Sequence, residues 1–186
     1  MPIIKSKEGE REALLHASRL MLVSARTAPK SGGVDDILTA IVFGKEKEAL
    51  AEEMDKMAEE RKIEQFKRDA KNLRNSEAAV LIGVRGTRSF IINCGACGYA
   101  SCDKFDEAQK KAGQDFMGPT CLFKALDLGI ALGSAAKTAS LLNVDNRIMY
   151  RVGTAARRLN MLPEATVIMG IPISAKGKSI YFDRRR

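Results

Sequence analysis

Three cysteines within the ten residues NCGACGYASC, at positions 93–102, constrain this chain more than any other feature. With a fourth cysteine the spacing becomes Cys94-x2-Cys97-x4-Cys102-x18-Cys121, and it uses every cysteine in the sequence. The stretch also holds two glycines and two alanines, so it offers little bulk for a packed core. A loop that is rich in thiols and poor in bulky side chains predicts a metal centre.

Three observations favour an iron–sulfur cluster over zinc. Three cysteines share one loop and the fourth is remote, whereas structural zinc sites more often use two separated Cys-x2-Cys pairs. The residues between the cysteines are small, so backbone N–H groups can approach and hydrogen-bond the sulfides. Cys121 opens an expected helix, whose N-terminal dipole favours a thiolate. We therefore predict a [4Fe–4S] cluster on the four cysteines; structural zinc, and thiol chemistry or disulfides, remain as alternatives.

The composition limits the cellular location and the kinds of binding partner that we expect. A chain of 186 residues with 45% apolar residues can form one compact domain with a real core. Its first residues are charged and its longest apolar stretch, 125–136, is too short to cross a bilayer, so we expect no membrane association and a cytoplasmic location, where thiols stay reduced. The net charge of +8 favours acidic partners.

Nucleic acid is a disfavoured partner on this composition. Aromatic residues make up only 5% of the chain, too few for a platform that stacks bases. The basic residues are spread along the sequence, and no DNA-binding motif appears. The closest approach to a basic patch is formed by Arg147, Arg151, Arg157 and Arg158.

Hydrophobic periodicity predicts alternating helices and strands around a central sheet, an α+β or α/β domain. Residues 78–84 are apolar throughout, as expected of a strand buried on both faces. Because the cysteine segment interrupts the alternation, we expect a core of residues 1–92 and 122–186 with an insert at 93–121. The expected helices are 9–28, 44–62, 63–74, 103–112, 121–142 and 145–160, and the expected strands are 37–43, 78–84 and 165–171, the last ended by Pro172.

The cysteine pattern resembles the short four-iron four-sulfur domain of electron-transfer proteins, C-x2-C-x4-C followed by a distant cysteine. One position departs from that family: Leu122 follows the last cysteine where the family usually has proline, and Pro119 precedes it. The resemblance implies a [4Fe–4S] cluster on the same four cysteines.

The flanking segments resemble the FMN-dependent nitroreductase fold. LMLVSARTAPKSGGVDDILTAIVFGKEKEALAEEM is similar to its opening helix, loop, strand and helix, LDLGIALGSA to its glycine segment, and VIMGIPISAKGK to its late strand and basic turn. As a whole, the chain resembles the "ferredoxin domain-containing" proteins of bacteria and archaea. This resemblance implies a nitroreductase-like sheet, a homodimer, and FMN at its interface with basic side chains on the phosphate. The residues that map onto the flavin site are Arg26, Lys30, Ser31, Gly129, Gly133, Lys176 and Lys178.

The same residues also have purely structural interpretations. Residues 30–33 fit a helix C-cap and turn. Gly129 and Gly133, four residues apart, fit close helix packing, and Lys176 and Lys178 fit a solvated hairpin. The Arg-Arg-Ser signature and the loop asparagine of the nitroreductases are missing.

Taken together, the sequence indicates a redox protein that passes electrons to an unknown small substrate or to a redox partner protein. FMN would convert between one-electron and two-electron steps, as in an FMN- and [4Fe–4S]-dependent oxidoreductase. No side chain stands out as a general acid or base, so no catalytic residue is assigned. The alternatives are an electron carrier with no substrate of its own, and a zinc- or cluster-containing binding or sensing module without catalytic activity.

Overall fold

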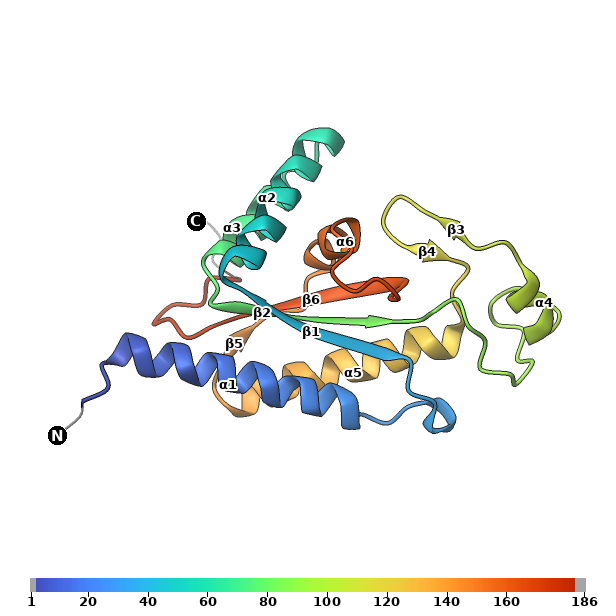
Figure 1. Cartoon of the computed structure of the whole chain (residues 1–186), viewed down its shortest axis with the longest axis horizontal. Coiled ribbons are helices and arrows are strands. Elements are labelled where there is room, and N and C mark those ends of the chain that lie inside the picture. The colour runs from blue at the N-terminus through green and yellow to red at the C-terminus, as the bar shows by residue number, and fades with distance from the viewer. Residues whose placement is uncertain (1–2, 183–186) are drawn as a thin grey trace.

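The fold is a four-stranded antiparallel sheet between two layers of helices (Figure 1). The computed structural model describes residues 3–182. The strand order is β1 (Ile37–Phe43), β2 (Ala78–Val84), β6 (Val167–Ser174) and β5 (Asp145–Asn146). The protein is therefore α+β, with strands β1 and β2 at the predicted positions.

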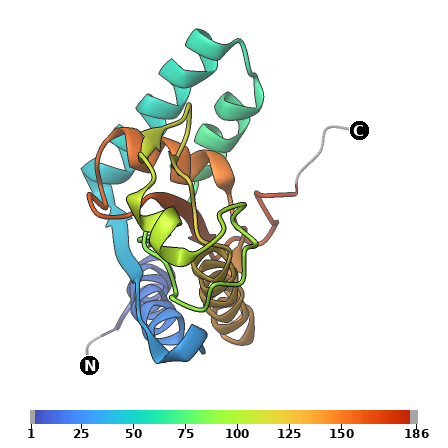
Figure 2. The same cartoon turned by 90° about the vertical axis from the view of Figure 1, so that its right-hand side faces the viewer.

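Helices cover both faces of the sheet (Figures 1 and 2). The long helices α1 (Ser6–Thr27) and α5 (Leu122–Leu141) pack side by side against one face. Three helices cover the other face: α2 (Gly44–Arg61), α3 (Gln65–Arg74) and α6 (Tyr150–Arg158).

Strand β2 joins the two halves of the core, because all seven of its residues are buried. Side chains alternate across a strand, so Val80 and Ile82 pack in the cluster beneath α1 and α5 while Ala79 and Leu81 pack in the cluster beneath α2, α3 and α6. This double burial explains why the segment is apolar without alternation, as the sequence predicted.

The helix expected at 103–112 is wrong in length. Helix α4 spans only Cys102–Glu107, and the chain then forms a small hairpin of β3 (Lys111–Ala112) and β4 (Met117–Gly118). Only Cys102 and Phe105 of α4 are buried, so a longer helix would have no further core to pack against.

The helix expected at 145–160 begins late, at Tyr150, because the preceding residues pair with β6 instead. Asp145 and Asn146 form β5, and Met149 exchanges both backbone hydrogen bonds with Gly170. Strand β6 also runs past Pro172, contrary to the sequence prediction. The backbone N–H of Gly170 points away from β2, toward Met149. Pro172 lies two residues later, so its backbone nitrogen points the same way, and the missing N–H removes no hydrogen bond to β2.

Residues 85–121, with α4 and the β3–β4 hairpin, lie beyond one end of the sheet, at the right in Figure 1. The loop that follows α1, with a short 3₁₀ turn at Ser31–Gly33, lies at the same end. Among the described residues, no helix combines the length and apolarity needed to cross a membrane.

Candidate metal centre

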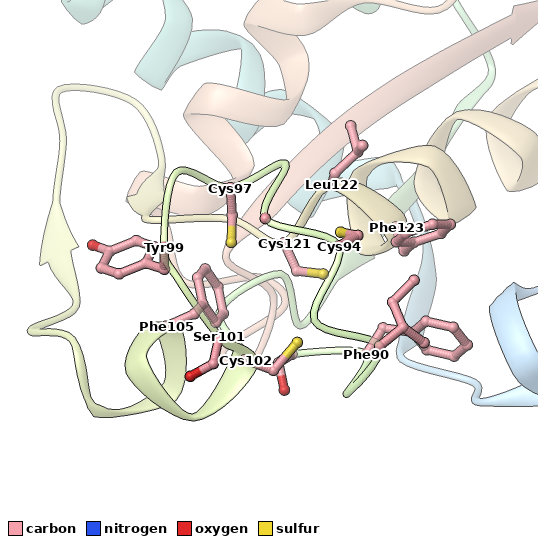
Figure 3. A pocket seen from close by; sticks show the side chains of 13 residues that line it. Phe90, Cys94, Cys97, Tyr99, Ser101, Cys102, Phe105, Cys121, Leu122 and Phe123 are labelled. Carbon is pink, nitrogen blue, oxygen red and sulfur yellow. The ribbon is translucent and has the colours of Figure 1, made fainter.

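All four cysteines line one narrow cavity beyond the end of the sheet (Figure 3). Cys94 and Cys97 come from the loop, Cys102 begins α4, and Cys121 directly precedes α5. All four are free thiols, and they range from the exposed Cys94 to the buried Cys102 and Cys121. The cavity encloses about 330 Å³ between the atoms, open solvent at its mouth included.

The cysteine loop is closed by a reciprocal pair of contacts. The backbone N–H of Cys102 donates to Asn93 Oδ1 at 2.7 Å, and the N–H of Asn93 donates to Cys102 Sγ at 3.3 Å. Gly95 and Gly98 both have positive φ, and the N–H of Gly98 donates to the Gly95 carbonyl at 2.9 Å. These two glycines make the turn that brings Cys94 and Cys97 to one side of the cavity, because other residues rarely adopt this backbone conformation.

Cys121 is tied to the central sheet and not to the loop. Its N–H donates to the Gly86 carbonyl at 2.8 Å, and the N–H of Gly86 donates to Thr166 Oγ1, also at 2.8 Å. A Cβ atom at Gly86 would lie 2.7 Å from Thr120 and 2.9 Å from Thr166 Oγ1, so only glycine fits. Sequence reasoning missed Gly86 and Thr166; a glycine two residues after the most apolar strand was the available signal.

Aromatic side chains form the walls of the cavity. Phe90 and Phe123 pack with ring centroids 5.4 Å apart on one side, and Tyr99 and Phe105 meet edge-on at 5.7 Å on the other (Figure 3). Phe105 is buried and the other three rings are partly exposed, so the walls shield the inner part of the cavity from water and strengthen charge interactions there.

The residues present fit a soft metal centre by their chemistry. Four thiols converge on one cavity, which is the donor set of iron–sulfur and tetrahedral zinc sites. Within residues 3–182, however, no group of three or more His, Cys, Asp or Glu side chains is arranged to hold a metal ion as it stands. The thiols would therefore have to draw together around a bound group.

Three of the residues that map onto the flavin site already have partners within the chain. Arg26 pairs with Asp35 and donates to the Ile37 carbonyl at 2.9 Å. Burial pushes the pKa of Asp35 upward, but the hydrogen bond and charge of Arg26 outweigh it, and the pKa is lowered. Lys30 Nζ donates to carbonyls at the end of α1, including that of Ala28 at 2.8 Å, and thus caps the helix.

Ser31 is held by α5. Its N–H and its hydroxyl donate to the same carboxylate oxygen of Asp127, at 2.9 and 2.8 Å, and Asp127 is only 2% exposed. Gly129 and Gly133 lie on the outward side of α5, where a Cβ atom at either would meet no described atom within 4 Å. They do not serve packing between helices of one chain.

Lys176 lies far from these residues, in a second cavity at the opposite end of the sheet. Lys7 and Arg11, at the start of α1, line the same cavity, as do Lys47 and Arg74. Burial lowers the pKa of Lys47, whose ammonium donates to two backbone carbonyls at 2.8 and 2.7 Å. The helix between Lys7 and Arg26 is about 28 Å long at 1.5 Å per residue, so one chain does not bring the expected flavin residues together.

The arginines named as the nearest approach to a basic patch are mostly engaged. Arg147 donates to the Tyr181 carbonyl at 2.8 Å, Arg151 pairs with Asp69 at 3.1 Å, and Arg158 pairs with Glu53 at 2.8 Å. Side chains held in this way offer little to a phosphate backbone.

Similarity to known proteins identifies the family of this chain. Residues 117–184, which include Cys121 but not the other three cysteines, match the family described as "Uncharacterized protein containing a ferredoxin domain". An uncharacterized protein of Archaeoglobus fulgidus is 48% identical over 182 residues, which cover 98% of this chain and 97% of that protein. The chain belongs to this ferredoxin-domain family.

Solved structures show that this ferredoxin-domain protein has a nitroreductase-like fold. A putative NADH dehydrogenase/NAD(P)H nitroreductase of Bacteroides thetaiotaomicron matches with a TM-score of 0.55 at 15% identity, over 95% of this chain and 77% of that one. A putative nitroreductase of Desulfovibrio desulfuricans, solved in complex with FMN, matches with a TM-score of 0.55 at 12% identity, over 92% and 79% of the two chains. At such identities the likeness establishes the fold alone.

Proposed function

We propose that this ferredoxin-domain protein is an iron–sulfur redox protein whose four cysteines hold a [4Fe–4S] cluster. The observation that carries the proposal is the common cavity: thiols from the loop, from α4 and from the start of α5 line one space with aromatic walls. Such a cluster, when bound, stores and passes one electron at a time. Its need for reduced thiols suits a cytoplasmic protein.

Each part of the chain has a distinct role in this proposal. Cys121 stands at the N-terminus of a 20-residue helix, whose dipole stabilises the thiolate. Its bond to Gly86 fixes one ligand to the rigid core, while the glycine turn allows Cys94 and Cys97 to close onto a bound group. Because Cys94 is exposed, this side of the site faces solvent, where a redox partner would exchange electrons.

Anaerobic reconstitution tests the cluster. We expect the wild-type chain to take up about four iron and four sulfide ions and to turn brown. Cys97→Ala and Cys121→Ala should lose most of that iron, and the loop should become less stable, because metal binding is coupled to folding. Thr120→Ser, next to Cys121, is the matched control and should load like the wild type. Zinc in place of iron would reject the redox function and favour the alternative, a binding or sensing module.

For the flavin, we propose that FMN binds between two copies of the chain. The fold resembles that of nitroreductases, one of which was solved in complex with FMN, and this likeness supports the proposal. The loop at Ser31 and Lys176 lie at opposite ends of α1, so a second copy in the opposite orientation is needed to bring this loop toward a partner copy's Lys176 and Lys178. In this arrangement the lysines bind the phosphate and the loop contacts the ring.

Flavin content of the purified protein tests this arrangement. Denaturation should release a yellow fluorescent flavin from the wild type, and Lys176→Ala and Lys178→Ala should each retain less of it without losing iron. The control is Lys56→Ala, an exposed lysine of α2. Unchanged flavin content in either variant would remove that lysine from the phosphate site, and a wild type free of flavin would leave a plain electron carrier.

A further inference from the structure

Lys124 is a fully buried cation that the proposed function does not yet use. Its side chain is 0% exposed, and Nζ lies 2.7 Å from Asp36 Oδ2. Beyond this ion pair, Nζ has no hydrogen-bond partner among the described residues. Burying an ammonium group is costly unless negative charge and hydrogen bonds compensate for it, and here the compensation is incomplete.

The position of Lys124 in α5 adds to that cost. Cys121 is the N-cap of the helix, so Lys124 is the third residue of the first turn. The positive end of a helix dipole repels a cation there. A lysine at such a position indicates that the site is built to meet additional negative charge.

The carboxylate that pairs with Lys124 is shared with other cations. Asp36 is its ion-pair partner, and it also lies 3.9 Å from Arg85 and 3.9 Å from Arg88. Arg85 is shared with Glu164 at 2.8 Å. With Asp127, a buried carboxylate one turn further along α5, three cations face three carboxylates, and the fully buried cation among them is Lys124.

One aromatic layer separates this cation from the cysteines. Lys124 Nζ lies 5.7 Å from the ring centroid of Phe90, and Phe90 packs on Phe123. Both rings line the cysteine cavity. Charges interact strongly across such an apolar layer, because little water is present to screen them.

We propose that the buried charge of Lys124 raises the reduction potential of the site formed by the four cysteines; this inference rests on the proposed [4Fe–4S] cluster. Reduction by a one-electron donor adds one negative charge to the site and makes or breaks no bond. Lys124 stabilises that added charge, and the cluster in turn supplies the negative charge that Asp36 provides only in part. The net charge around a cluster is one of the factors that set its potential.

Potentiometric titration of the reconstituted protein with dithionite, followed by electron paramagnetic resonance, tests the inference. We expect Lys124→Met to make one-electron reduction about tenfold less favourable, a fall of about 59 mV. Lys104→Met is the matched control, because it also removes one positive charge close to a cysteine but its side chain is 65% exposed. Water screens Lys104, so its loss should change the equilibrium less than about twofold.

A second variant changes the charge in the opposite direction. Asp36→Asn keeps Lys124 and removes the carboxylate, so reduction should become easier than in the wild type. If the Lys124→Met protein does not take up a cluster, Asp36→Asn tests the inference on its own. A reduction potential above that of the wild type supports the inference, and an unchanged or lower potential overturns it.

Two results separate this inference from the proposed function. A wild-type chain that takes up no iron rejects both. Variants that load fully with iron and sulfide but titrate at the wild-type potential overturn the role of Lys124 and leave the cluster in place. The same holds if Lys104→Met shifts the potential as much as Lys124→Met.

Discussion

Tyr181 shows how one buried hydroxyl holds the segment after β6 against the core. Its side chain is 3% exposed, and its hydroxyl lies 2.9 Å from Ser76 Oγ. Ser76 donates its own proton to the Asn72 carbonyl at 2.7 Å, so Tyr181 is the donor to Ser76. Burial raises the pKa of Tyr181 to about 12, although the hydroxyls of Ser76 and Ser174 lower it in part.

This raised pKa predicts that the wild type becomes less stable than a Tyr181→Phe variant at high pH. The native pKa of about 12 exceeds the unfolded value of about 10, so the benefit of the neutral hydroxyl is complete below pH 10 and is lost as pH rises toward 12. Tyr181→Phe should unfold about 1 kcal/mol more easily at pH 7, because it lacks one hydrogen bond. Above pH 10 the wild type should lose up to about 1.4 kcal/mol per pH unit relative to the variant.

Urea unfolding between pH 7 and pH 11.5 measures this difference. The order of stability of the two proteins should invert near the upper end of the range. Parallel stability curves for the wild type and Tyr181→Phe would show that the buried hydroxyl does not set the alkaline limit.

At the scale of secondary structure, α6 and β6 approach so closely that only glycine fits between them. A Cβ atom at Gly153 would lie 1.8 Å from the Ile168 carbonyl oxygen, which is part of the backbone and cannot move aside. Alanine favours a helix over glycine by about 1 kcal/mol, but separating α6 from β6 costs more. We expect Gly153→Ala to lower the free energy of unfolding by about 3 kcal/mol.

The control for Gly153→Ala is a helical glycine with space around it. A Cβ atom added at Gly9 in α1 would lie 3.5 Å from the side chain of Ile4, an ordinary van der Waals contact. Gly9→Ala should therefore raise the free energy of unfolding by up to about 1 kcal/mol. Thermal unfolding followed by circular dichroism compares the two variants. A Gly153→Ala protein as stable as the wild type would show that α6 can shift from β6 at little cost.

The contrast between β2 and α6 explains which elements a sequence can predict. β2 was predictable because burial on both faces makes every residue apolar, which is a local property. The start of α6 depends on distant partners, because Met149 and β5 pair with residues of β6 more than twenty positions later. Periodicity carries no information on such pairings.

The cysteine site and the flavin site also differ in how far the sequence could predict them. The spacing of the cysteines was enough to predict that they serve one site, because three of them share a short loop and no others exist. The flavin residues could not be judged from spacing. Asp35 and Asp127, which engage Arg26 and Ser31, lie 9 and 96 positions away in the sequence, and only the fold shows those contacts.

The outward side of α5 is where we expect two chains to meet. Leu122, Leu126 and Ile130 are 42–50% exposed there, and Gly129 and Gly133 leave space for a close approach. In a twofold dimer each residue on this side of α5 is buried in both copies, so one substitution removes its contribution twice. Burying a leucine or isoleucine contributes about 2 kcal/mol, so Ile130→Glu removes about 4 kcal/mol and weakens the dimer about a thousandfold.

Sedimentation velocity tests this expectation. The wild type should sediment as a dimer and Ile130→Glu as a monomer, with unchanged circular dichroism. Leu159→Glu, a comparable exposed residue that directly follows α6, is the control and should stay dimeric. Because the four cysteines belong to one chain and the flavin residues are divided between two, the monomeric variant should lose flavin but keep its iron. A wild type that sediments as a monomer at every concentration would contradict the dimer and, with it, the shared flavin site.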